Sequence, residues 1–561
     1  MKKENRVIEV IMLLVAMGII AGVTAFPYLH TGLYGYAPDY IYHMNRIEGV
    51  KQALLAGDYP VYVYSNFFGG KGYGSPMFYP DIFLVIPAIM RIAGLSILQT
   101  YKVFAIIVCF IATATTYISL KIVSGDKMLS LSGTFLLMLS EFYLADLIFR
   151  AGYSSYISYI FLPILFAGIY DFFMMGAKRC YLMGIGLGGL VLCHIINSFI
   201  ALLLTIIIFV LMLLTKKGRE AFFNKEHLIN LVKTAVITLL ITGYYTFPMI
   251  EQMTSGIRRV YQDPWAHIGE FVQPFETLFL PTGYFFNIAY VGVGIPILLL
   301  LGLFARKTEN TMANFYYVLG LLLLLSMTKL VPWAALENTI LNQLQFTFRI
   351  YPFALCAIIF GMILTGREII SEKNRVWLLV YAVIMTTIFG VWQNKTALAE
   401  TYGYFNEVNA DIIAENSETV GRGEWLPVAY PIEENRERND VKAEGDPDTR
   451  FEYVRAEGKV GGSFEIGESA IEAYSVPQIF YRGYGAKLVA ADGTKYKLSC
   501  EMTEDGLTRV LMSPETIGLS GTVIVSYVGT ILQKITLCIS ILTVIAGVVL
   551  KIVLKKRQKN K

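Results

Sequence analysis

Apolar segments long enough to cross a membrane recur along most of this chain. An α-helix needs about 20 residues to cross the roughly 30 Å hydrocarbon core of a bilayer. Because lipid offers no partner to a free backbone N–H or C=O group, such segments fold as helices that satisfy their own backbone. The sequence predicts about twelve of them, near residues 7–26, 99–120, 128–146, 155–176, 181–196, 197–214, 229–249, 286–305, 312–329, 351–366, 376–393 and 524–551.

The composition agrees with an α-helical polytopic membrane protein. Hydrophobic residues make up 55% of the 561 residues and charged residues only 16%, whereas soluble domains carry about 25% charged residues. No cleavage site of small residues follows the first apolar segment, so we expect a retained helix and not a removed signal peptide. The segment 81–95 is apolar but short, and Pro87 and Arg91 interrupt it, which favours a position at the membrane interface.

Lysine and arginine predict the orientation of the chain, because cytoplasmic loops carry an excess of them. If the N-terminus is cytoplasmic, then every inside loop is basic across all twelve segments, and the C-terminus is cytoplasmic too. The first long loop, residues 27–98, then lies outside. The basic residues assigned to the inside are Lys2, Lys3, Arg6, Lys121, Lys127, Lys178, Arg179, Lys216, Lys217, Arg219, Lys225, Arg306, Lys307, Arg367, Lys373, Arg375 and those of the tail 555–561.

The stretch 394–522 is polar and differs from the rest of the chain. It contains 23 Asp and Glu residues against 13 Lys and Arg residues, a net charge of −10, whereas the whole chain carries +4. We therefore expect a transmembrane domain at 1–393, an extracytoplasmic domain at 394–522, and a final transmembrane helix with a basic tail at 523–561.

Short β-prone runs predict that this extracytoplasmic domain is β-rich and sandwich-like. Asp492-Gly493 is a hairpin turn signal. Before the strands, residues 394–448 are rich in Asn, Glu, Gly and Pro, which is typical of a loop. The expected strands lie near 451–455, 463–466, 486–490 and 507–512.

Polar residues in the first long loop are the leading candidates for chemistry. Apolar residues at spacings of three and four from Ile41 to Leu54 predict an amphipathic helix along the membrane surface. Asp39, His43 and Arg46 follow one another at i, i+4 and i+7, so they share another face of this helix. Two plainer interpretations stay open. Asp39 after Pro38 fits an N-cap, and His43 with Arg46 fits a solvated helix face.

A loop of glycines and aromatic residues follows, from Phe67 to Pro80, and includes Tyr73 and Tyr79. Glycine permits close backbone approach, and aromatic rings offer flat surfaces suited to sugars or isoprenoid chains. Tyr73 and Tyr79 are therefore auxiliary candidates.

Four arginines are predicted at the outer ends of segments, where the charge bias makes them less expected. A guanidinium fork can bind a phosphate with two hydrogen bonds, so these residues are candidates for an anionic ligand. Snorkelling to lipid headgroups is the alternative. They are Arg150, Arg258, Arg259 and Arg349. His194 and Glu251 are weaker candidates, because a helix-to-helix hydrogen bond explains His194 equally well.

These motifs together resemble the C-type (GT-C) superfamily of integral-membrane glycosyltransferases. The chain is most similar to the bacterial YfhO-like proteins and to the membrane proteins grouped as 6-pyruvoyl-tetrahydropterin synthase-related. The matching features are Asp39-Tyr-Ile-Tyr-His43 with Arg46, the run Gly72–Pro80, Arg150–Tyr153, Gln345–Arg349, Gly423–Pro427 and the β-rich outer domain before the last span.

The resemblance implies transfer of a hexose from a polyprenyl-phosphate sugar donor to an envelope glycopolymer, glycolipid or protein on the outer face. It assigns Asp39 as the base with His43 beside it, and Arg349, Arg150, Arg258 and Arg259 to the lipid phosphate. A divalent metal is left open, because Asp39 has no adjacent acidic residue. Membrane lipids are the other expected partners, and no nucleic acid is expected. A lipid or glycolipid flippase, and a non-catalytic envelope scaffold, are the alternatives.

Overall fold

The structure is a computed structural model, and it divides the chain into two compact units. The first unit comprises Met1–Tyr40, Leu98–Leu239 and Ala266–Val408, and the second comprises Ile41–Ile97, Leu240–Trp265 and Asn409–Lys561. The described residues are 2–30, 39–148, 150–256, 258–262, 264, 266–278, 310–401 and 423–559.

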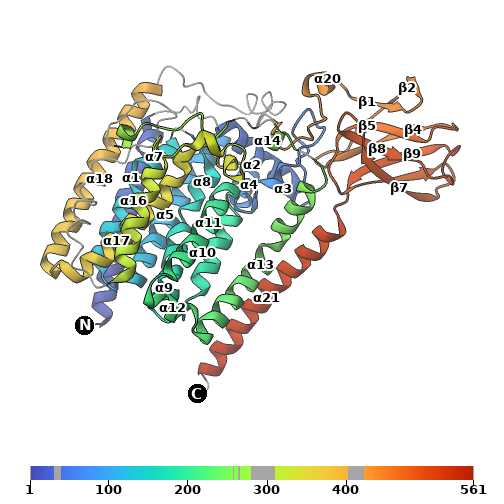
Figure 1. Ribbon diagram of the computed structural model, residues 1–561. Helices are drawn as coiled ribbons and strands as arrows, with labels where there is room; N and C mark the ends of the chain where they lie inside the picture. The colour runs from blue at the N-terminus through green and yellow to red at the C-terminus, as the bar shows by residue number, and fades with distance from the viewer. Residues whose placement is uncertain are drawn as a thin grey trace. The chain divides into compact units, whose positions relative to one another are not determined.

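The first unit is a bundle of helices, several of which run side by side in Figure 1. Helix α17 forms its centre, because 94% of the apolar window around it is buried. Helix α16 packs closely on α17, since a Cβ at Gly320 would lie 2.5 Å from the side chain of Ile358. The helices are α1 (Lys2–His30), α5 (Ile97–Ser124), α6 (Lys127–Met138), α7 (Glu141–Ile148), α8 (Tyr153–Ser158), α9 (Leu162–Met174), α10 (Tyr181–Val191), α11 (Ile195–Met212), α12 (Lys216–Phe222), the first part of α13 (Lys225–Met253), α16 (Thr311–Ser326), α17 (Tyr351–Ile369) and α18 (Glu372–Thr401).

Eight helices among the described residues are long and apolar enough to cross a membrane, or nine if the bent pair α6 and α7 forms one span. The predicted multi-pass architecture is therefore confirmed, but the count of twelve is not reached. The segments 181–196 and 312–329 form helices of only 11 and 16 residues. The segment 286–305 lies outside the described residues. The segment 81–95 contains the short apolar helix Ile82–Ile92, and its place at the membrane interface stays a prediction.

The predicted last span begins too early. Residues 524–527 belong to a β-strand, and the final helix α21 spans Ile531–Lys559. Hydropathy does not distinguish the end of the strand from the start of the helix, because a short run of apolar β-branched residues suits a buried strand as well as a helix.

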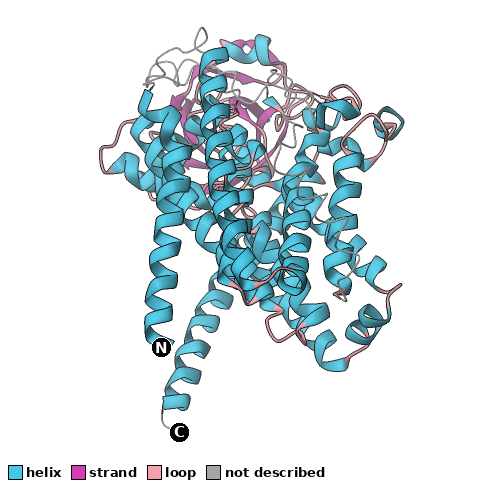
Figure 2. Ribbon diagram, turned by 90° about the vertical axis from the view of Figure 1, so that its left-hand side faces the viewer, coloured by secondary structure: helices cyan, strands magenta, loops and turns pink. Residues whose placement is uncertain are grey.

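The second unit combines the first long loop, the end of α13 and the C-terminal part of the chain. Among its described residues, nine strands form one antiparallel sheet in the order β2-β1-β5-β8-β7-β6-β9-β4-β3, drawn in magenta in Figure 2. Its helices are α2 (Tyr40–Leu55), α3 (Ser75–Phe78), the 3-10 turn η1 (Ile82–Leu84), α4 (Val85–Ile92), α14 (Arg259–Gln262), α20 (Ile432–Arg436) and α21. Its strands are β1 (Asp440–Ala443), β2 (Asp446–Glu452), β3 (Val454–Arg455), β4 (Gly461–Ile466), β5 (Ala473–Ile479), β6 (Tyr484–Ala490), β7 (Lys495–Met502), β8 (Leu507–Leu511) and β9 (Gly521–Tyr527).

The β domain confirms the predicted β-rich fold. The turn at Asp492-Gly493 joins β6 to β7, and Gly493 has the positive φ of +86° that this turn requires. The sheet curls back on itself, since the rings of Phe451 on β2 and Phe464 on β4, near opposite ends of the strand order, lie 6.1 Å apart. The predicted loop 394–448 is too long, because the first strand already begins at Asp440.

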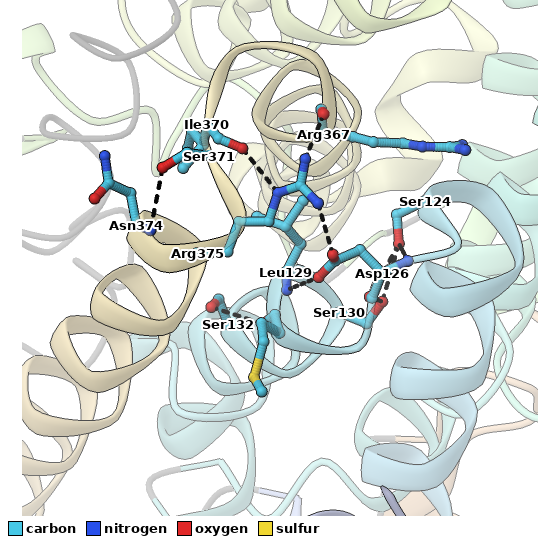
Figure 3. A network of polar contacts seen from close by, with 11 residues as sticks. Ser124, Asp126, Leu129, Ser130, Ser132, Arg367, Ile370, Ser371, Asn374 and Arg375 are labelled. Carbon is cyan, nitrogen blue, oxygen red and sulfur yellow. Dashed lines mark hydrogen bonds and ion pairs between the residues drawn. The ribbon is translucent and has the colours of Figure 1, made fainter. Parts of the chain in front are cut away.

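A polar network in the first unit joins the loop before α6 to the loop between α17 and α18 (Figure 3). The Asp126 carboxylate accepts from the backbone N–H of Leu129 at 2.9 Å and caps α6. Its other oxygen accepts from the Arg375 guanidinium at 2.8 Å, and Arg375 also donates to the carbonyls of Ile370 and Arg367. One aspartate thus holds the ends of three helices together.

Candidate active site

Asp39 and Arg150 are held together in the first unit by two contacts. The backbone N–H of Asp39 donates to the carbonyl of Arg150 at 3.1 Å, and the Arg150 guanidinium lies 3.3 Å from the Asp39 carboxylate. Asp39 directly precedes the first residue of α2, which is the N-cap position expected from the sequence. Arg150 lies in the tight turn between α7 and α8, where Ala151 has a φ of +52°.

A second carboxylate, Asp146, lies on the other side of Arg150. Its oxygen is 3.0 Å from the Arg150 guanidinium, one helical turn earlier in the chain. The Asp146 side chain is 0% exposed, whereas that of Asp39 is 39% exposed. A buried carboxylate is costly unless a cation and hydrogen bonds compensate it. Asp146 therefore orients Arg150, and Asp39 is the carboxylate that a ligand can reach.

Asp146 was not among the residues expected from the sequence. It is the last residue of the predicted apolar segment 128–146, where its charge is concealed by the hydropathy of its neighbours. An ionisable residue inside a span is a functional candidate by default, and that rule would have selected it.

Arg349 belongs to the same cluster. It lies in the 3-10 turn η6 (Thr347–Ile350) immediately before α17, and it interacts electrostatically with Asp146. Its guanidinium donates to the carbonyl of Leu344 at 2.8 Å and to the side-chain oxygen of Gln345 at 2.9 Å. The sequence motif Gln345–Arg349 also supplies an aromatic face, since the Arg150 guanidinium lies 5.3 Å from the centre of the Phe348 ring.

His194 is not part of this cluster among the contacts that the structure describes. It caps α11, where its Nδ1 accepts from the backbone N–H of Asn197 at 3.1 Å. The side chain of Asn197 donates to Ser158 at 2.9 Å and so joins α11 to α8. This hydrogen bond between the two helices is thus made by Asn197, whereas the hydrogen bond of the His194 side chain to the Asn197 backbone caps its own helix.

In the second unit, His43 and Arg46 are buried on helix α2, with exposed fractions of 1% and 0%. The interpretation of these two residues as a solvated helix face is therefore wrong. Arg46 donates to the backbone carbonyls of Tyr79 and Pro80 at 3.0 and 2.6 Å. Another of its nitrogens lies 3.2 Å from Nδ1 of His43. Because arginine has no acceptor, this His43 nitrogen accepts, and a neutral His43 carries its proton on Nε2.

Tyr79 completes this group, because its ring lies under the Arg46 guanidinium at 4.5 Å. Asp81 is close by and was not expected from the sequence. Its carboxylate accepts from the Tyr64 hydroxyl at 3.2 Å. Burial raises the pKa of Asp81 to about 6, and the charge of Arg46 opposes this shift. The signal was available, since Asp81 follows a proline before an apolar segment, much as Asp39 follows Pro38 before an amphipathic one.

The remaining candidates join different segments of the second unit. The Tyr73 hydroxyl accepts from the backbone N–H of Trp425 at 3.1 Å. Arg258 is only 2% exposed and lies against the rings of Phe78 and Tyr481 at 5.7 and 5.1 Å. Arg259 donates to the backbone carbonyl of Tyr430. Glu251 accepts from Thr530 at 2.6 Å.

The described residues contain no group of three or more His, Cys, Asp or Glu side chains arranged to hold a metal ion. The acidic residues near Asp39 are instead paired with arginine. The chemistry that this cluster offers is that of a partly exposed carboxylate paired with the Arg150 guanidinium, with a second guanidinium, that of Arg349, interacting with the buried carboxylate of Asp146.

Comparison with protein families gives one match. A family model described as "6-pyruvoyl-tetrahydropterin synthase related domain; membrane protein" matches residues 77–397, which is more than half of the chain. No curated protein matches the chain.

Two crystal structures of the Archaeoglobus fulgidus oligosaccharyltransferase are similar to this chain. The apo structure shares 14% sequence identity over 78% of this chain and 58% of its own, with a TM-score of 0.40. The complex with Zn and sulfate shares 14% identity over 68% of this chain and 52% of its own, with a TM-score of 0.34. This chain thus spans somewhat more than half the length of that enzyme.

Proposed function

We propose that this chain, which belongs to the family of membrane proteins with the 6-pyruvoyl-tetrahydropterin synthase related domain, is a glycosyltransferase that uses a polyprenyl-phosphate-linked sugar. The family prediction made from the sequence is confirmed by the match over residues 77–397. The reaction class comes from the resemblance to C-type glycosyltransferases. The arrangement of Asp39, Arg150 and Asp146 is the observation that supports it most directly.

Asp39 is the proposed base. Its carboxylate is 39% exposed, and Arg150 fixes its position. In the proposed step, the acceptor hydroxyl gives its proton to Asp39 while its oxygen bonds to the anomeric carbon of the sugar. The bond between that carbon and the phosphate oxygen breaks, and the polyprenyl phosphate leaves with the electron pair. A positioned carboxylate that takes the proton contributes about 10²- to 10⁴-fold to the rate of such a step.

Arg349 is the proposed partner of the departing phosphate, with Arg150 second. The negative charge on the phosphate develops as the glycosidic bond breaks, so fixed guanidinium groups stabilise the transition state more than the ground state. Arg349 suits this role because its bonds to Leu344 and Gln345 hold the guanidinium in one orientation at the start of α17. Asp146 is a positioning residue that acts through Arg150.

Roles for Arg258, Arg259, His43, Arg46, Tyr73, Tyr79, His194 and Glu251 in donor or acceptor binding stay predictions. The same holds for a divalent metal and for the acceptor, an envelope glycopolymer, glycolipid or protein. The distribution of lysine and arginine supports the proposal that both termini are cytoplasmic and that Asp39 and residues 394–522 are extracytoplasmic.

The test is sugar transfer by the purified full-length chain in liposomes, with undecaprenyl-phosphate-linked radiolabelled hexoses as donors. Each donor is assayed with Mg²⁺ or Mn²⁺ and again with EDTA. Comparison of the rates shows whether activity depends on a divalent metal. The proposal expects transfer to an envelope acceptor fraction or hydrolysis of at least one donor. Movement of labelled lipid across the bilayer without any turnover would contradict it and would favour a flippase.

A further inference from the structure

A small pocket in the second unit shares no lining residue with the cluster around Asp39. It lies where the loop before α3, the segment around Asp81 and the last turns of α13 meet. Its walls are apolar and aromatic, and Asp81 is the one charged residue in its lining. The lining includes Tyr62, Met77, Pro80, Asp81, Tyr244 and Tyr245.

The Asp81 carboxylate can accept further hydrogen bonds. It is 9% exposed, and the Tyr64 hydroxyl donates to one of its oxygens at 3.2 Å. A carboxylate has about four lone-pair sites for hydrogen bonds. An occupant of this pocket that satisfies Asp81 must therefore be a donor, either a hydroxyl or an ammonium group.

Another polar group in the pocket lining is the Tyr62 hydroxyl. The hydroxyl of Tyr62 is buried and makes no hydrogen bond among the described residues. It interacts electrostatically with Asp81, as do the phenols of Tyr59 and Tyr244. Aromatic rings around a carboxylate favour a cation, because the negative faces of the rings attract it and the carboxylate receives its hydrogen bonds.

The pocket lies beside a surface suited to the membrane interface. Asp81 directly precedes the apolar helix Ile82–Ile92. On this helix Ile86, Ile89 and Ile92 share one face and are 44%, 54% and 43% exposed. Exposed isoleucines on one face of a short helix suit burial at the boundary between headgroups and acyl chains.

We infer that this pocket binds a primary ammonium group, supplied by a lipid headgroup or by an amino sugar. A primary ammonium group has three N–H groups that can donate to Asp81, whereas a trimethylammonium group has none. The inference does not depend on glycosyl transfer, since no residue of the Asp39 cluster lines the pocket.

The experiment is native mass spectrometry of the full-length chain with added phosphatidylethanolamine, phosphatidylcholine or phosphatidylglycerol. Parallel samples contain glucosamine as a soluble amine. We expect phosphatidylethanolamine to bind more tightly than the other two lipids, and Asp81→Asn to weaken this binding about tenfold or more, because a charge-assisted hydrogen bond is lost. Binding of glucosamine in place of the lipid, with the same dependence on Asp81, would support the inference and identify an amino sugar as the source.

Two further variants make the result decisive. Asp58→Asn removes the same charge from an exposed residue of the same loop, outside the pocket lining, and should leave binding unchanged. Tyr62→Phe removes a hydroxyl that makes no hydrogen bond, so it should fold normally and weaken phosphatidylethanolamine binding by a smaller factor. Equal binding of the three lipids without any glucosamine binding would overturn the inference. So would an unchanged preference in folded Asp81→Asn or, if that variant does not fold, in Tyr62→Phe.

Discussion

The guanidinium of Arg150 lies 3.3 Å from the carboxylate of Asp39, although 111 residues separate them in the chain. Asp146 holds the same guanidinium from the buried side at 3.0 Å. One arginine therefore connects a buried carboxylate to a partly exposed one. This geometry gives the proposed base a fixed position while leaving it accessible, which is what general base catalysis requires.

Arg349→Ala should weaken the use of the lipid donor. The guanidinium is the proposed partner of the donor phosphate, and losing a charge-assisted bond of this kind should raise the KM for the donor about tenfold or more. Arg349→Lys keeps the positive charge but loses the planar guanidinium. Its donor KM should therefore lie between those of the wild type and Arg349→Ala. Steady-state kinetics at varied donor concentration measures the effect. A donor KM equal to that of the wild type in a folded Arg349→Ala would refute the assignment.

Arg258→Gln should lower the melting temperature. Arg258 is 2% exposed and packs against Phe78 and Tyr481. Removal of a buried cation from an aromatic setting leaves unfilled space and polar atoms without partners, a change that costs on the order of 1–3 kcal/mol. Thermal unfolding of the variant beside the wild type tests this. An unchanged melting temperature together with a raised donor KM would contradict a packing role and favour the predicted role in donor binding.

Asp126→Ala should destabilise the first unit. Asp126 caps α6 and pairs with Arg375, and both side chains are less than one fifth exposed. Loss of the cap alone costs about 1 kcal/mol. Glu220→Ala serves as the control, because the Lys216–Glu220 pair is 3.9 Å long and mostly exposed, and such pairs contribute little. If both variants melt at the same temperature as the wild type, Asp126 does not hold these helices together.

The stability of the second unit should depend on pH through Asp81. Its pKa is about 6 in the folded chain, above its ordinary value of 3.8, because burial favours the neutral form. Its contribution is therefore complete below about pH 4 and is lost as the pH rises through 6. The groups that face it are Arg46 on α2, Tyr59, Tyr62 and Tyr64 in the following segment, and Tyr244 on α13.

The measurement is the melting temperature of wild type and Asp81→Asn between pH 4 and 8. Arginine stays charged and the loop tyrosines stay neutral in this range, because burial raises the pKa of Tyr62 to about 12 and that of Tyr59 further. The wild type should lose stability relative to Asp81→Asn as the pH rises. A constant difference between the two across the range would show that Asp81 does not titrate near 6.

The helical architecture was predictable because hydropathy reports directly on burial in lipid. Segments such as 7–26 and 99–120 correspond to helices in the structure. Hydropathy gave the wrong start for the last span at residues 524–527. A short β-branched strand there is soon followed by a helix, and composition does not show where the strand ends. Composition describes only residues that are neighbours in the sequence. It therefore could not show that residues 41–97 fold into one unit with the C-terminal part of the chain.

The individual residues of the candidate site could be predicted from the sequence, but their proximity in the fold could not. Asp39, Arg150 and Arg349 are conspicuous as charged residues near the ends of apolar segments. Their proximity depends on tertiary packing, which a single sequence does not encode in any local pattern. His43 and Arg46 show the opposite error, because a charged residue is normally exposed. The burial of Arg46 is made acceptable by tertiary contacts, among them its hydrogen bonds to the carbonyls of Tyr79 and Pro80 and its contact with the Tyr79 ring.

Sugar transfer by Asp39→Asn, measured beside the wild type in liposomes, tests the central claim most directly. Asparagine can still cap α2 and accept a hydrogen bond from Arg150, but it cannot take up the proton of the acceptor. We predict a folded variant whose kcat falls about 10²- to 10⁴-fold, with Asp58→Asn as active as the wild type. A stable Asp39→Asn that transfers sugar at the wild-type rate would contradict the assignment of Asp39 as the base.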